Sequence, residues 1–180
     1  MTYHAIKLSG FDPNRVFGSG TLLDSARFRT LLSQKMGIHP DDLRAYILGE
    51  HGDSQFPLFS MAMTGGSKIS ENQLSEEIYQ KTKKAGHEVM NKKGHTNYAI
   101  SMSAALIIET IAWDSNRTIP VSQMVNGYLG EQDVCLSLPA VIGSNGISMV
   151  IEPVLKDNEI EAFHACAEIV RVGIALSKSS

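Results

Sequence analysis

Residues 134–154, with the sequence VCLSLPAVIGSNGISMVIEPV, decide the fold class that this chain is expected to adopt. The tripeptide SNG at 144–146 divides two apolar, β-branched runs, and a turn of this kind typically joins antiparallel strands in a hairpin. A third strand is predicted over 119–129, and the four residues GEQD separate it from the strand at 134–142. Parallel strands need a crossover of about a dozen residues or more, so these short connections favour an antiparallel sheet over a parallel doubly wound one.

Four segments outside this sheet have the apolar spacing of helices. In one of them Ser75 is a candidate N-cap, and Lys92 and Lys93 in the last turn suit the negative end of the helix dipole. The segment 96–114 is mostly apolar, which predicts a helix buried on most sides. The predicted helices cover 21–37, 75–94, 96–114 and about 158–177, short strands are predicted at 45–48 and 56–63, and TGGSKIS at 64–70 is expected to form a surface turn. The expected class is therefore α+β, with helices interleaved with antiparallel hairpins.

The composition is that of a globular protein without a polyanionic partner. The 180 residues are 43% hydrophobic and 19% charged, with a formal net charge of -3, which gives no reason to expect binding to nucleic acid or to an anionic membrane. The longest apolar stretch, around 104–113, contains Glu109 and is too short to cross a bilayer. Two cysteines are too few for a disulfide framework. With no secretory leader in MTYHAIKLSGF, we expect a single cytoplasmic domain over residues 1–180.

A histidine between two glycines indicates a possible functional loop. In LGEHGDSQF, residues 48–56, His51 lies between two short predicted strands. Gly, Asp and Ser are ordinary turn formers, so His51 can be a loop histidine without a further role. Alternatively, it exchanges a proton with a substrate, as an imidazole beside a carboxylate can do near neutral pH.

The helix predicted at 21–37 offers two further groups for such a site. Asp24 and Arg27 are three residues apart and therefore share one helical face. They can form an ordinary surface ion pair, which stabilises a fold little. Alternatively, Asp24 holds His51 in its protonated form, while the planar guanidinium of Arg27 binds the carboxylate of a small 2-oxo acid through two hydrogen bonds. The spacing alone leaves both possibilities open.

A dinucleotide-binding fingerprint is not evident in the chain. FGSGTLL contains Gly18 and Gly20, but Leu23 stands at the third glycine position of that motif. No predicted strand precedes it with an acidic residue about 20 positions on, as a ribose-binding site would need. The residues predict a tight loop before a helix, and no metal site is expected.

Four stretches together resemble one family. They are KLSGFDPNRVFGSGTLLDSARFR, ILGEHGDSQFP, KKGHTNYAIS and DVCLSLPAVIGSNGI, in this order along essentially the whole chain. The combination of the DSAR helix with the GEHGDS loop is similar to NAD-dependent L-lactate dehydrogenases of the bacterial type, and specifically to their substrate-binding C-terminal domain. The resemblance implies the C-terminal fold of the lactate/malate dehydrogenases without the Rossmann domain, and it favours the functional interpretation of His51.

The resemblance assigns roles to the residues that match the family's motifs. His51 would protonate the carbonyl of pyruvate or deprotonate the hydroxyl of lactate, with Asp24 as its carboxylate partner. Arg27 would bind the substrate carboxylate. Thr96 would pack beside the substrate side chain.

The resemblance also implies NAD as the cofactor of hydride transfer, with Ser19 and Ile100 matching positions that line the nicotinamide. The family's nucleotide-binding half carries a mobile loop and an asparagine that contacts the substrate, and these have no counterpart here. Residues 1–20 would be a remnant of the connection to that half, and the chain a natural truncation or an expressed fragment. Because hydride transfer depends on holding both reactants together, we expect no lactate dehydrogenase activity from the chain alone.

Arg29 and Arg44 are candidates for an allosteric anion site. In bacterial members of the family, an arginine at the first position and a histidine at the second bind fructose 1,6-bisphosphate at a subunit interface. Arg29 lies two residues past Arg27 and should point away from the substrate side of its helix. The arginine at position 44 is permanently charged, which argues against pH-dependent activation and is compatible with sugar-phosphate binding. Alternatively, it is an exposed arginine without a ligand.

Three interpretations of the whole chain stay open. The first is the catalytic domain of an L-lactate dehydrogenase, and the second is a domain of another L-2-hydroxy acid dehydrogenase that accepts longer side chains. Malate is less favoured, although the loop that best separates lactate from malate has no counterpart here. The third is a non-catalytic oligomerisation module, since the family's tetramer contacts lie largely in this half. An uncovered apolar surface predicts a homo-oligomer.

Overall fold

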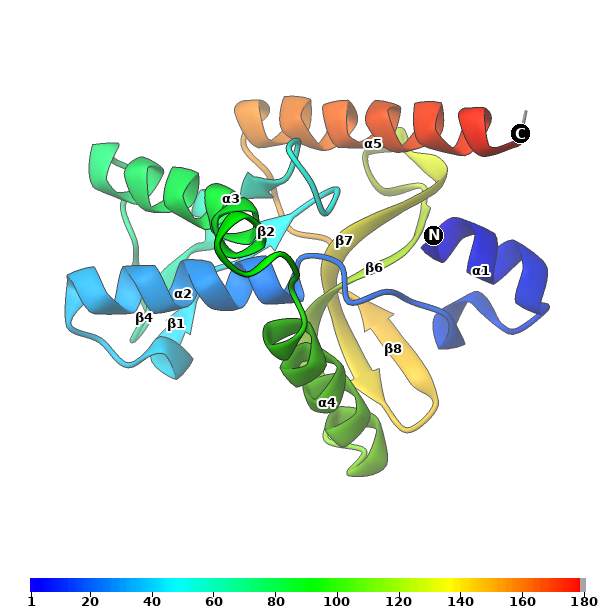
Figure 1. The fold of residues 1–180 in the computed structure, drawn as a ribbon, viewed down its shortest axis with the longest axis horizontal. Helices are drawn as coiled ribbons and strands as arrows, with labels where there is room; N and C mark the ends of the chain where they lie inside the picture. Colours follow the sequence, from blue (N-terminus) through cyan, green and yellow to red (C-terminus); the bar gives the residue numbers. More distant parts are fainter. Residues whose placement is uncertain (179–180) are drawn as a thin grey trace.

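The central sheet of the computed structural model, which describes residues 1–178, is antiparallel throughout (Figure 1). It consists of β6 (Arg117–Asn126), β7 (Gln132–Gly143) and β8 (Gly146–Val150), in the order β6-β7-β8. The tight turn between β7 and β8 contains the predicted SNG tripeptide, and its Gly146 has a φ of 98° that a side chain would strain. The antiparallel sheet and the α+β class predicted from the sequence are confirmed.

Several strand boundaries differ from the predicted ones. β6 ends at Asn126 because Gly127, with a φ of 95°, leads the chain into a short 3-10 helix. The continuous strand predicted over 56–63 is wrong, since a 3-10 helix at Phe59–Met61 interrupts it and Pro57 has no N–H to continue a ladder. Five two-residue strands occupy this part of the chain: β1 (Leu43–Arg44), β2 (Ile47–Leu48), β3 (Phe56–Pro57), β4 (Met63–Thr64) and β5 (Ser67–Lys68). Of the surface turn predicted over 64–70, only Gly65 and Gly66 form a turn, between β4 and β5, whereas β5 pairs with β4 and Ile69 is buried.

The helices within the described residues are α1 (Thr2–Ser9), α2 (Leu22–Met36), α3 (Gln73–Lys93), α4 (Tyr98–Ala112) and α5 (Asp157–Lys178). Helix α1 was not predicted from the sequence. The prediction of Ser75 as an N-cap is wrong by three residues, because Asn72 caps α3. The Asn72 side chain accepts the N–H of Ser75 at 3.0 Å, and Ser75 Oγ accepts the N–H of Asn72 at 2.9 Å, which completes a capping box.

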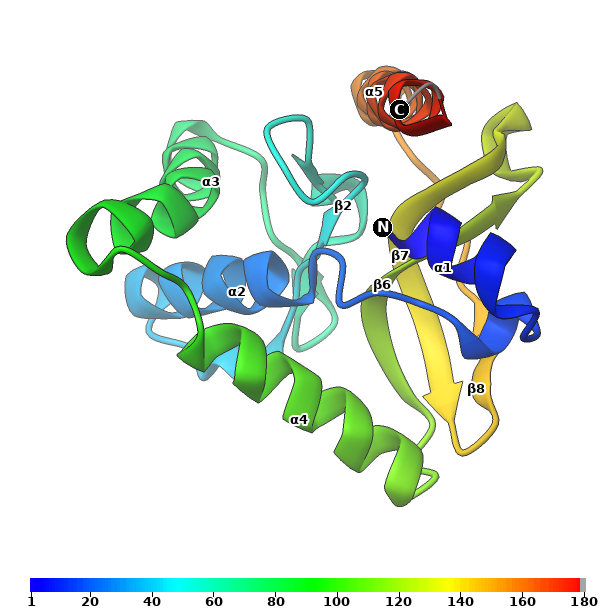
Figure 2. The ribbon, with the colours of Figure 1, turned by 45° about the vertical axis from the view of Figure 1, so that its right-hand side comes forward.

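Helix α4 is exposed along one side, which contradicts the expected burial on most sides. It packs on α2 and the sheet, and its other face is free (Figure 2). Tyr98, Met102 and Trp113 are each more than 70% exposed. The apolar pattern of this helix therefore marks a surface that no part of residues 1–178 covers. No helix within that range combines the length and hydropathy of a membrane span.

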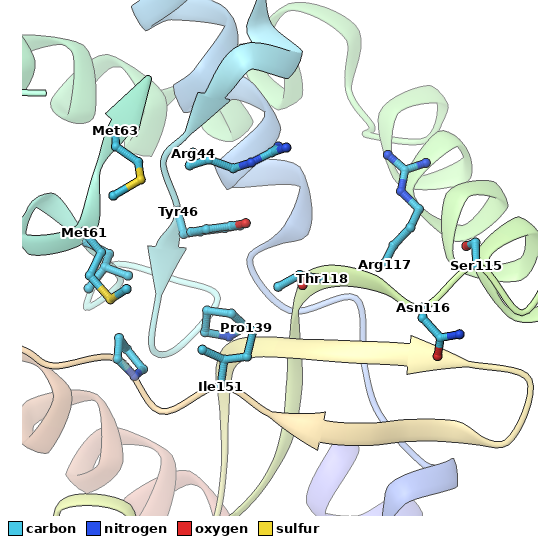
Figure 3. A pocket seen from close by; sticks show the side chains of 12 residues that line it. Arg44, Tyr46, Met61, Met63, Ser115, Asn116, Arg117, Thr118, Pro139 and Ile151 are labelled. Carbon is cyan, nitrogen blue, oxygen red and sulfur yellow. The ribbon is translucent and has the colours of Figure 1, made fainter. Parts of the chain in front are cut away.

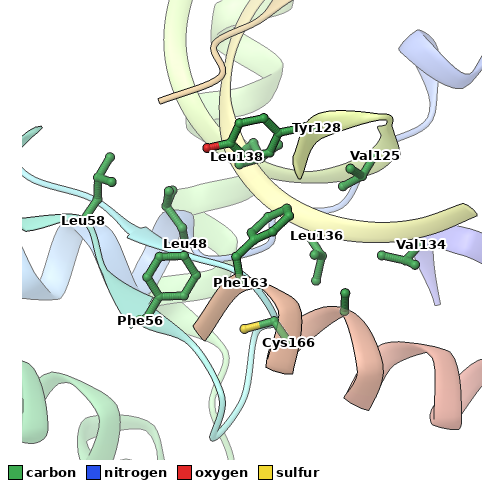
Figure 4. Close-up of a cluster of buried hydrophobic side chains, with 11 residues drawn as sticks. Leu48, Phe56, Leu58, Val125, Tyr128, Val134, Leu136, Leu138, Phe163 and Cys166 are labelled. Atoms are coloured by element: carbon green, nitrogen blue, oxygen red, sulfur yellow. The ribbon is translucent and has the colours of Figure 1, made fainter. Parts of the chain in front are cut away.

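A buried cluster attaches α5 to the sheet and to both ends of the loop between β2 and β3. Phe163 from α5 packs against Tyr128 with ring centroids 5.2 Å apart, and both belong to the same cluster as Leu136 on β7 (Figure 4). Leu48 and Phe56, which flank the loop, are also part of this cluster. Burial of apolar side chains at both ends thus restricts the path of the chain between them.

Candidate active site

The first turn of α2 and the loop between β2 and β3 bring two predicted site residues into contact. His51 lies in this loop, called here the histidine loop (residues 49–55), and its Nδ1 is 2.7 Å from Asp24 Oδ2. Asp24 is 3% exposed, whereas the His51 side chain is 60% exposed. Arg27 Nη1 lies 3.8 Å from the other carboxylate oxygen of Asp24. A buried carboxylate is therefore flanked by an imidazole and a guanidinium.

Buried hydrogen bonds fix the start of α2 against the strand that precedes the histidine loop. The Thr21 hydroxyl donates to the carbonyl oxygen of Ile47 at 2.6 Å, and the Ile47 N–H donates to Ser25 Oγ at 2.9 Å. The Ser137 hydroxyl accepts the backbone N–H of Thr21 at 3.1 Å. Ser137 also pairs with Gly49 through two backbone hydrogen bonds, of 3.1 and 2.8 Å. Strand β7 thus holds both the helix and the loop.

The glycines and small polar residues of the histidine loop fold it tightly. Gly49 has a φ of 90°, and a Cβ there would lie 2.5 Å from Cys166 Sγ, so this position requires glycine. The Ser54 hydroxyl donates to Glu50 Oε2 at 2.7 Å, and the Cys166 thiol donates to the carbonyl oxygen of Ser54 at 3.0 Å. Helix α5 therefore fixes the far side of a loop that the sequence alone presents as loosely constrained.

The three groups face a cavity of about 510 Å³. One wall is α2 with the histidine loop, and the second wall is α3, the connection after it and the start of α4. The predicted positions Thr96 and Ile100 lie on the second wall. The cavity is lined by Leu23, Asp24, Arg27, His51, Gly52, Asp53, Gln55, Lys83, Gly86, His87, Met90, Thr96 and Ile100.

The surroundings of His51 favour its protonated form. The hydrogen bond to Asp24 raises the pKa of His51, and the charges of Asp24 and Glu50 act in the same direction. Partial burial and the positive charge of Arg27 oppose this effect without cancelling it. Since Nδ1 is bound to Asp24, Nε2 is the ring nitrogen that remains available to a ligand.

Ser19 lines a second cavity, of about 730 Å³, that adjoins the first at His51. A planar group beside the imidazole would contact both cavities. The residues present are thus compatible with a nicotinamide between Ser19 and Ile100. No group of three or more metal-ligating side chains occurs among the residues that the structure describes.

Arg29 points to the opposite side of α2 from Arg27, as predicted. Its Nη1 donates to the carbonyl oxygen of Ala45 at 3.4 Å. Burial lowers the pKa of Arg29, Tyr46 and Asp41 oppose this effect, and Arg44 and Arg117 add to it. Arg29, Arg44 and Arg117 line one cavity of about 260 Å³. Within residues 1–178, none of the three guanidinium groups lies within 4 Å of a carboxylate.

Arg44 and Arg117 also line an adjoining cavity of about 560 Å³, and the Arg44 guanidinium is directed toward the side on which Arg117 lies (Figure 3). Met61 and Met63 lie on its apolar side. The contribution of Arg117 was missed at the sequence level. It follows α4 by five residues at the start of β6, and only the folded chain brings it near Arg44.

Comparisons with known proteins give the same assignment as the motifs. Residues 21–179 match the lactate/malate dehydrogenase alpha/beta C-terminal domain. The chain belongs to the lactate/malate dehydrogenase family. It is 43% identical, over 95% of its length, to the L-lactate dehydrogenase of Bifidobacterium animalis subsp. lactis, and 39% identical to that of Gloeobacter violaceus. It superposes on an L-lactate dehydrogenase structure from Clostridium thermocellum with a TM-score of 0.90 at 40% identity.

The chain spans a little over half the length of these relatives. It covers 57% of the Bifidobacterium protein and 55% of the Gloeobacter protein. The superposition on the Clostridium structure includes 94% of the residues of this chain and 58% of the residues of that one. The resemblance inferred from the sequence motifs to the C-terminal domain of L-lactate dehydrogenase is therefore confirmed.

The contact between Asp24 and His51 predicts a pH dependence that NMR can measure. Asp24→Asn should lower the pKa of His51, because an amide cannot stabilise the imidazolium as a carboxylate does. The pKa of His51 is raised in the folded chain above its value in an unfolded chain, which is about 6.5. The interaction with Asp24 therefore stabilises the fold fully below about pH 6.5, and this stabilisation is lost as the pH rises through the folded-state pKa.

Asp53→Asn is the matched control, since Asp53 lines the same cavity without bonding to His51. Asp53→Asn should change the pKa of His51 much less than Asp24→Asn does. Equal titration curves for the Asp24→Asn variant and the unmodified chain would contradict the assignment.

Proposed function

We propose that this chain is the substrate-binding and proton-transferring domain of an NAD-dependent L-lactate dehydrogenase, which interconverts pyruvate and L-lactate. The observation that carries this proposal is the 2.7 Å contact between His51 and the buried Asp24, beside Arg27 on one cavity. Besides a hydride donor, reduction of a 2-oxo acid needs a proton donor near neutral pH and a group that binds the carboxylate, and these two parts are present here.

In this proposal, Arg27 binds the substrate carboxylate and thereby fixes the orientation of the 2-oxo group. Its planar fork of N–H donors suits two parallel hydrogen bonds, which a lysine cannot make. The methyl group of pyruvate then lies toward Thr96. Because Asp24 is hydrogen-bonded to Nδ1 of His51, the substrate carbonyl oxygen accepts a hydrogen bond from Nε2.

His51 is the proton donor in the direction of reduction. Its Nε2–H bond breaks as the substrate carbonyl oxygen takes the proton, and the imidazole becomes neutral. When bound, NADH supplies the hydride that the carbonyl carbon accepts. Asp24 stabilises the charged imidazolium before the transfer and orients the ring throughout. In the direction of oxidation, the neutral ring of His51 removes the hydroxyl proton of lactate.

The residues that would hold the cofactor ring are Ser19 and Ile100. They line the two cavities that adjoin at His51, so a nicotinamide between them would lie beside the reacting carbon. The rest of a dinucleotide would need a phosphate-binding fingerprint, and this sequence has Leu23 in place of its third glycine.

Substrate binding can be tested on the chain itself by titrating pyruvate while following the NMR signals of His51. Pyruvate should perturb the His51 ring, and Arg27→Lys should weaken this binding about tenfold or more, because the two-bond contact is lost. Arg15→Lys is the control, since Arg15 is exposed and lines neither cavity at His51. Pyruvate binding that is equal in both variants would contradict the role of Arg27.

The same chain mixed with NADH and pyruvate should give no turnover above a buffer blank. Positioning of the two reactants accounts for about 7 to 11 kcal/mol of such a barrier, and the chain alone is not expected to provide it. A nucleotide-binding domain of a relative, supplied in trans, should restore turnover to the unmodified chain and not to a His51→Gln variant. Turnover by the chain without that domain would contradict the expectation.

We also propose an anion site at Arg29 and Arg44, with Arg117 as its third cation, for a sugar bisphosphate such as fructose 1,6-bisphosphate. Asp41 lines the same cavity, but none of the three guanidinium groups is within 4 Å of a carboxylate among residues 1–178, and a ligand with two phosphates would relieve their mutual repulsion. Since arginine does not lose its proton near neutral pH, the site should hold its charge at every physiological pH.

Titration with fructose 1,6-bisphosphate at pH 7 and pH 8 tests this site. The unmodified chain should bind with nearly equal affinity at both values, because the phosphates are close to doubly charged at pH 7 and an arginine keeps its charge over this range. Arg44→His should bind less tightly at pH 8 than at pH 7, since an imidazole loses its charge there. A parallel loss in the unmodified chain, or no binding at all, would contradict the proposal.

We further propose that the chain associates with itself through α4. Tyr98 and Met102 on α4, and Trp113 directly after it, are exposed and form an apolar surface of the kind that usually lies in an interface. Sedimentation should give a mass above the 19.6 kDa of one chain, and Met102→Lys combined with Trp113→Lys should reduce it. Val172→Lys, at an exposed position on α5, is the control. A chain that sediments as a monomer would contradict this association.

A further inference from the structure

The returning limb of the histidine loop is held by side chains from two helices. The carbonyl oxygen of Ser54 accepts a hydrogen bond from the Cys166 thiol of α5 at 3.0 Å. The next carbonyl oxygen along the chain, that of Gln55, accepts a hydrogen bond from the Tyr79 hydroxyl of α3. Both donors are buried, since Cys166 is 0% and Tyr79 8% exposed. Two consecutive backbone acceptors, close in sequence to His51, are therefore bound by distant parts of the chain.

Both side chains keep their protons near neutral pH and so remain donors. Burial raises the pKa of Tyr79 to about 12, and neighbouring acidic groups act in the same direction. These groups are Glu76, Cys166, Asp24 and Asp53. Burial also raises the pKa of the Cys166 thiol, and hydrogen bonds with Glu50 and Ser54 oppose this effect without cancelling it.

The position of His51 depends on the backbone that carries it. Its side chain is 60% exposed, so little packing holds the ring, and its Nδ1 must stay 2.7 Å from Asp24 for the contact to form. The pairing of β2 with β3, and of Gly49 with Ser137, fixes the base of the loop. The bonds at the two carbonyl oxygens fix its returning limb as well, which restricts the swing of the ring away from the carboxylate.

Tyr79 also joins the two walls of the substrate cavity. Its helix, α3, contributes to one wall, and the histidine loop contributes to the other. The Tyr79 ring belongs to a buried cluster that includes Phe28 of α2 and Phe59. Because the ring is packed in the core, its hydroxyl has a defined position from which it can hold the loop.

We propose that Tyr79, together with Cys166, is a positioning residue for the proton donor of this site. Neither lines the cavity at Arg27 or the one at Ser19, so each acts through His51. The inference rests on the proposed function, since it concerns the group that transfers the proton there. Loss of either donor leaves a buried carbonyl oxygen without its partner, which the loop can relieve by moving toward water.

Titration of His51 by NMR in a Tyr79→Phe variant of the 180-residue chain tests this inference. Phenylalanine keeps the ring in the core and lacks the hydroxyl, so the pKa of His51 should fall toward its ordinary value. Pyruvate binding should weaken about fivefold, because the loop would be in its binding-competent position for a smaller fraction of the time. Tyr128→Phe is the matched control, since the Tyr128 hydroxyl is also buried and donates to a carbonyl oxygen outside the loop, that of Pro153, at 2.5 Å. The control should leave the pKa of His51 unchanged.

A second pair of variants tests the other donor and does not depend on the folding of Tyr79→Phe. Cys166→Ala removes the thiol and should also lower the pKa of His51. Cys166→Ser keeps a donor at the same place and should restore the pKa of the unmodified chain. Cys135→Ala is the control for the loss of a buried thiol, since Cys135 lies on β7 and packs against α1.

The outcomes distinguish this inference from the proposed function. If pyruvate does not perturb His51 in the unmodified chain, the proposed function fails, and the pKa comparison still decides whether Tyr79 positions the ring. Equal pKa values of His51 in the unmodified chain and in folded Tyr79→Phe and Cys166→Ala overturn the inference and leave the proposed function intact. A fall in Tyr128→Phe as large as that in Tyr79→Phe would also overturn it, because the effect would then reflect overall stability.

Discussion

The placement of the candidate site depends on a buried set of hydrogen bonds that joins α2 to β2 and β7. Thr21 and Ser25, on either side of Asp24 in the sequence, both bond to Ile47, and Ser137 bonds to Thr21 and to Gly49. Each bond replaces water at a backbone group that would otherwise be unsatisfied, so a shift of the helix would leave polar atoms buried without partners. The set therefore fixes the first turn of the helix relative to the histidine loop.

The electrostatics of the site follow from this placement. A carboxylate at 3% exposure is costly unless it is paired, and Asp24 is paired on both sides, by His51 and Arg27. Its position in the first turn of α2 also places it at the positive end of the helix dipole. The same carboxylate raises the pKa of His51, so the burial of one residue determines the protonation of another that is largely exposed.

Features encoded by local patterns could be predicted from the sequence. The SNG turn predicted the antiparallel sheet. The spacing of Asp24 and Arg27 predicted that both lie on one face of a helix. The family motifs supplied the positions of Thr96 and Ile100 on the same cavity, which no spacing rule could give. Two local features were not predicted: the 3-10 helix at Phe59–Met61 and the capping of α3 by Asn72. Apolar periodicity does not distinguish a continuous strand from an interrupted one, nor one polar residue from another as the N-cap.

Other features depend on contacts between distant parts of the chain. Arg117 is 88 residues from Arg29 in the numbering and joins it only because β6 passes beside α2. Helix α4 has the composition of a buried helix, yet burial depends on what covers it, and residues 1–178 leave one face open.

The most direct test of the account is the titration of His51 by NMR in a Thr21→Val variant. Valine has nearly the shape of threonine but lacks the hydroxyl that donates to Ile47. The start of α2 should therefore be held less firmly against β2, and the pKa of His51 should fall toward its ordinary value. Thr30→Val is the control, because the Thr30 hydroxyl bonds within α2 to Ala26. A folded Thr21→Val chain in which the pKa of His51 equals that of the unmodified protein would contradict the account.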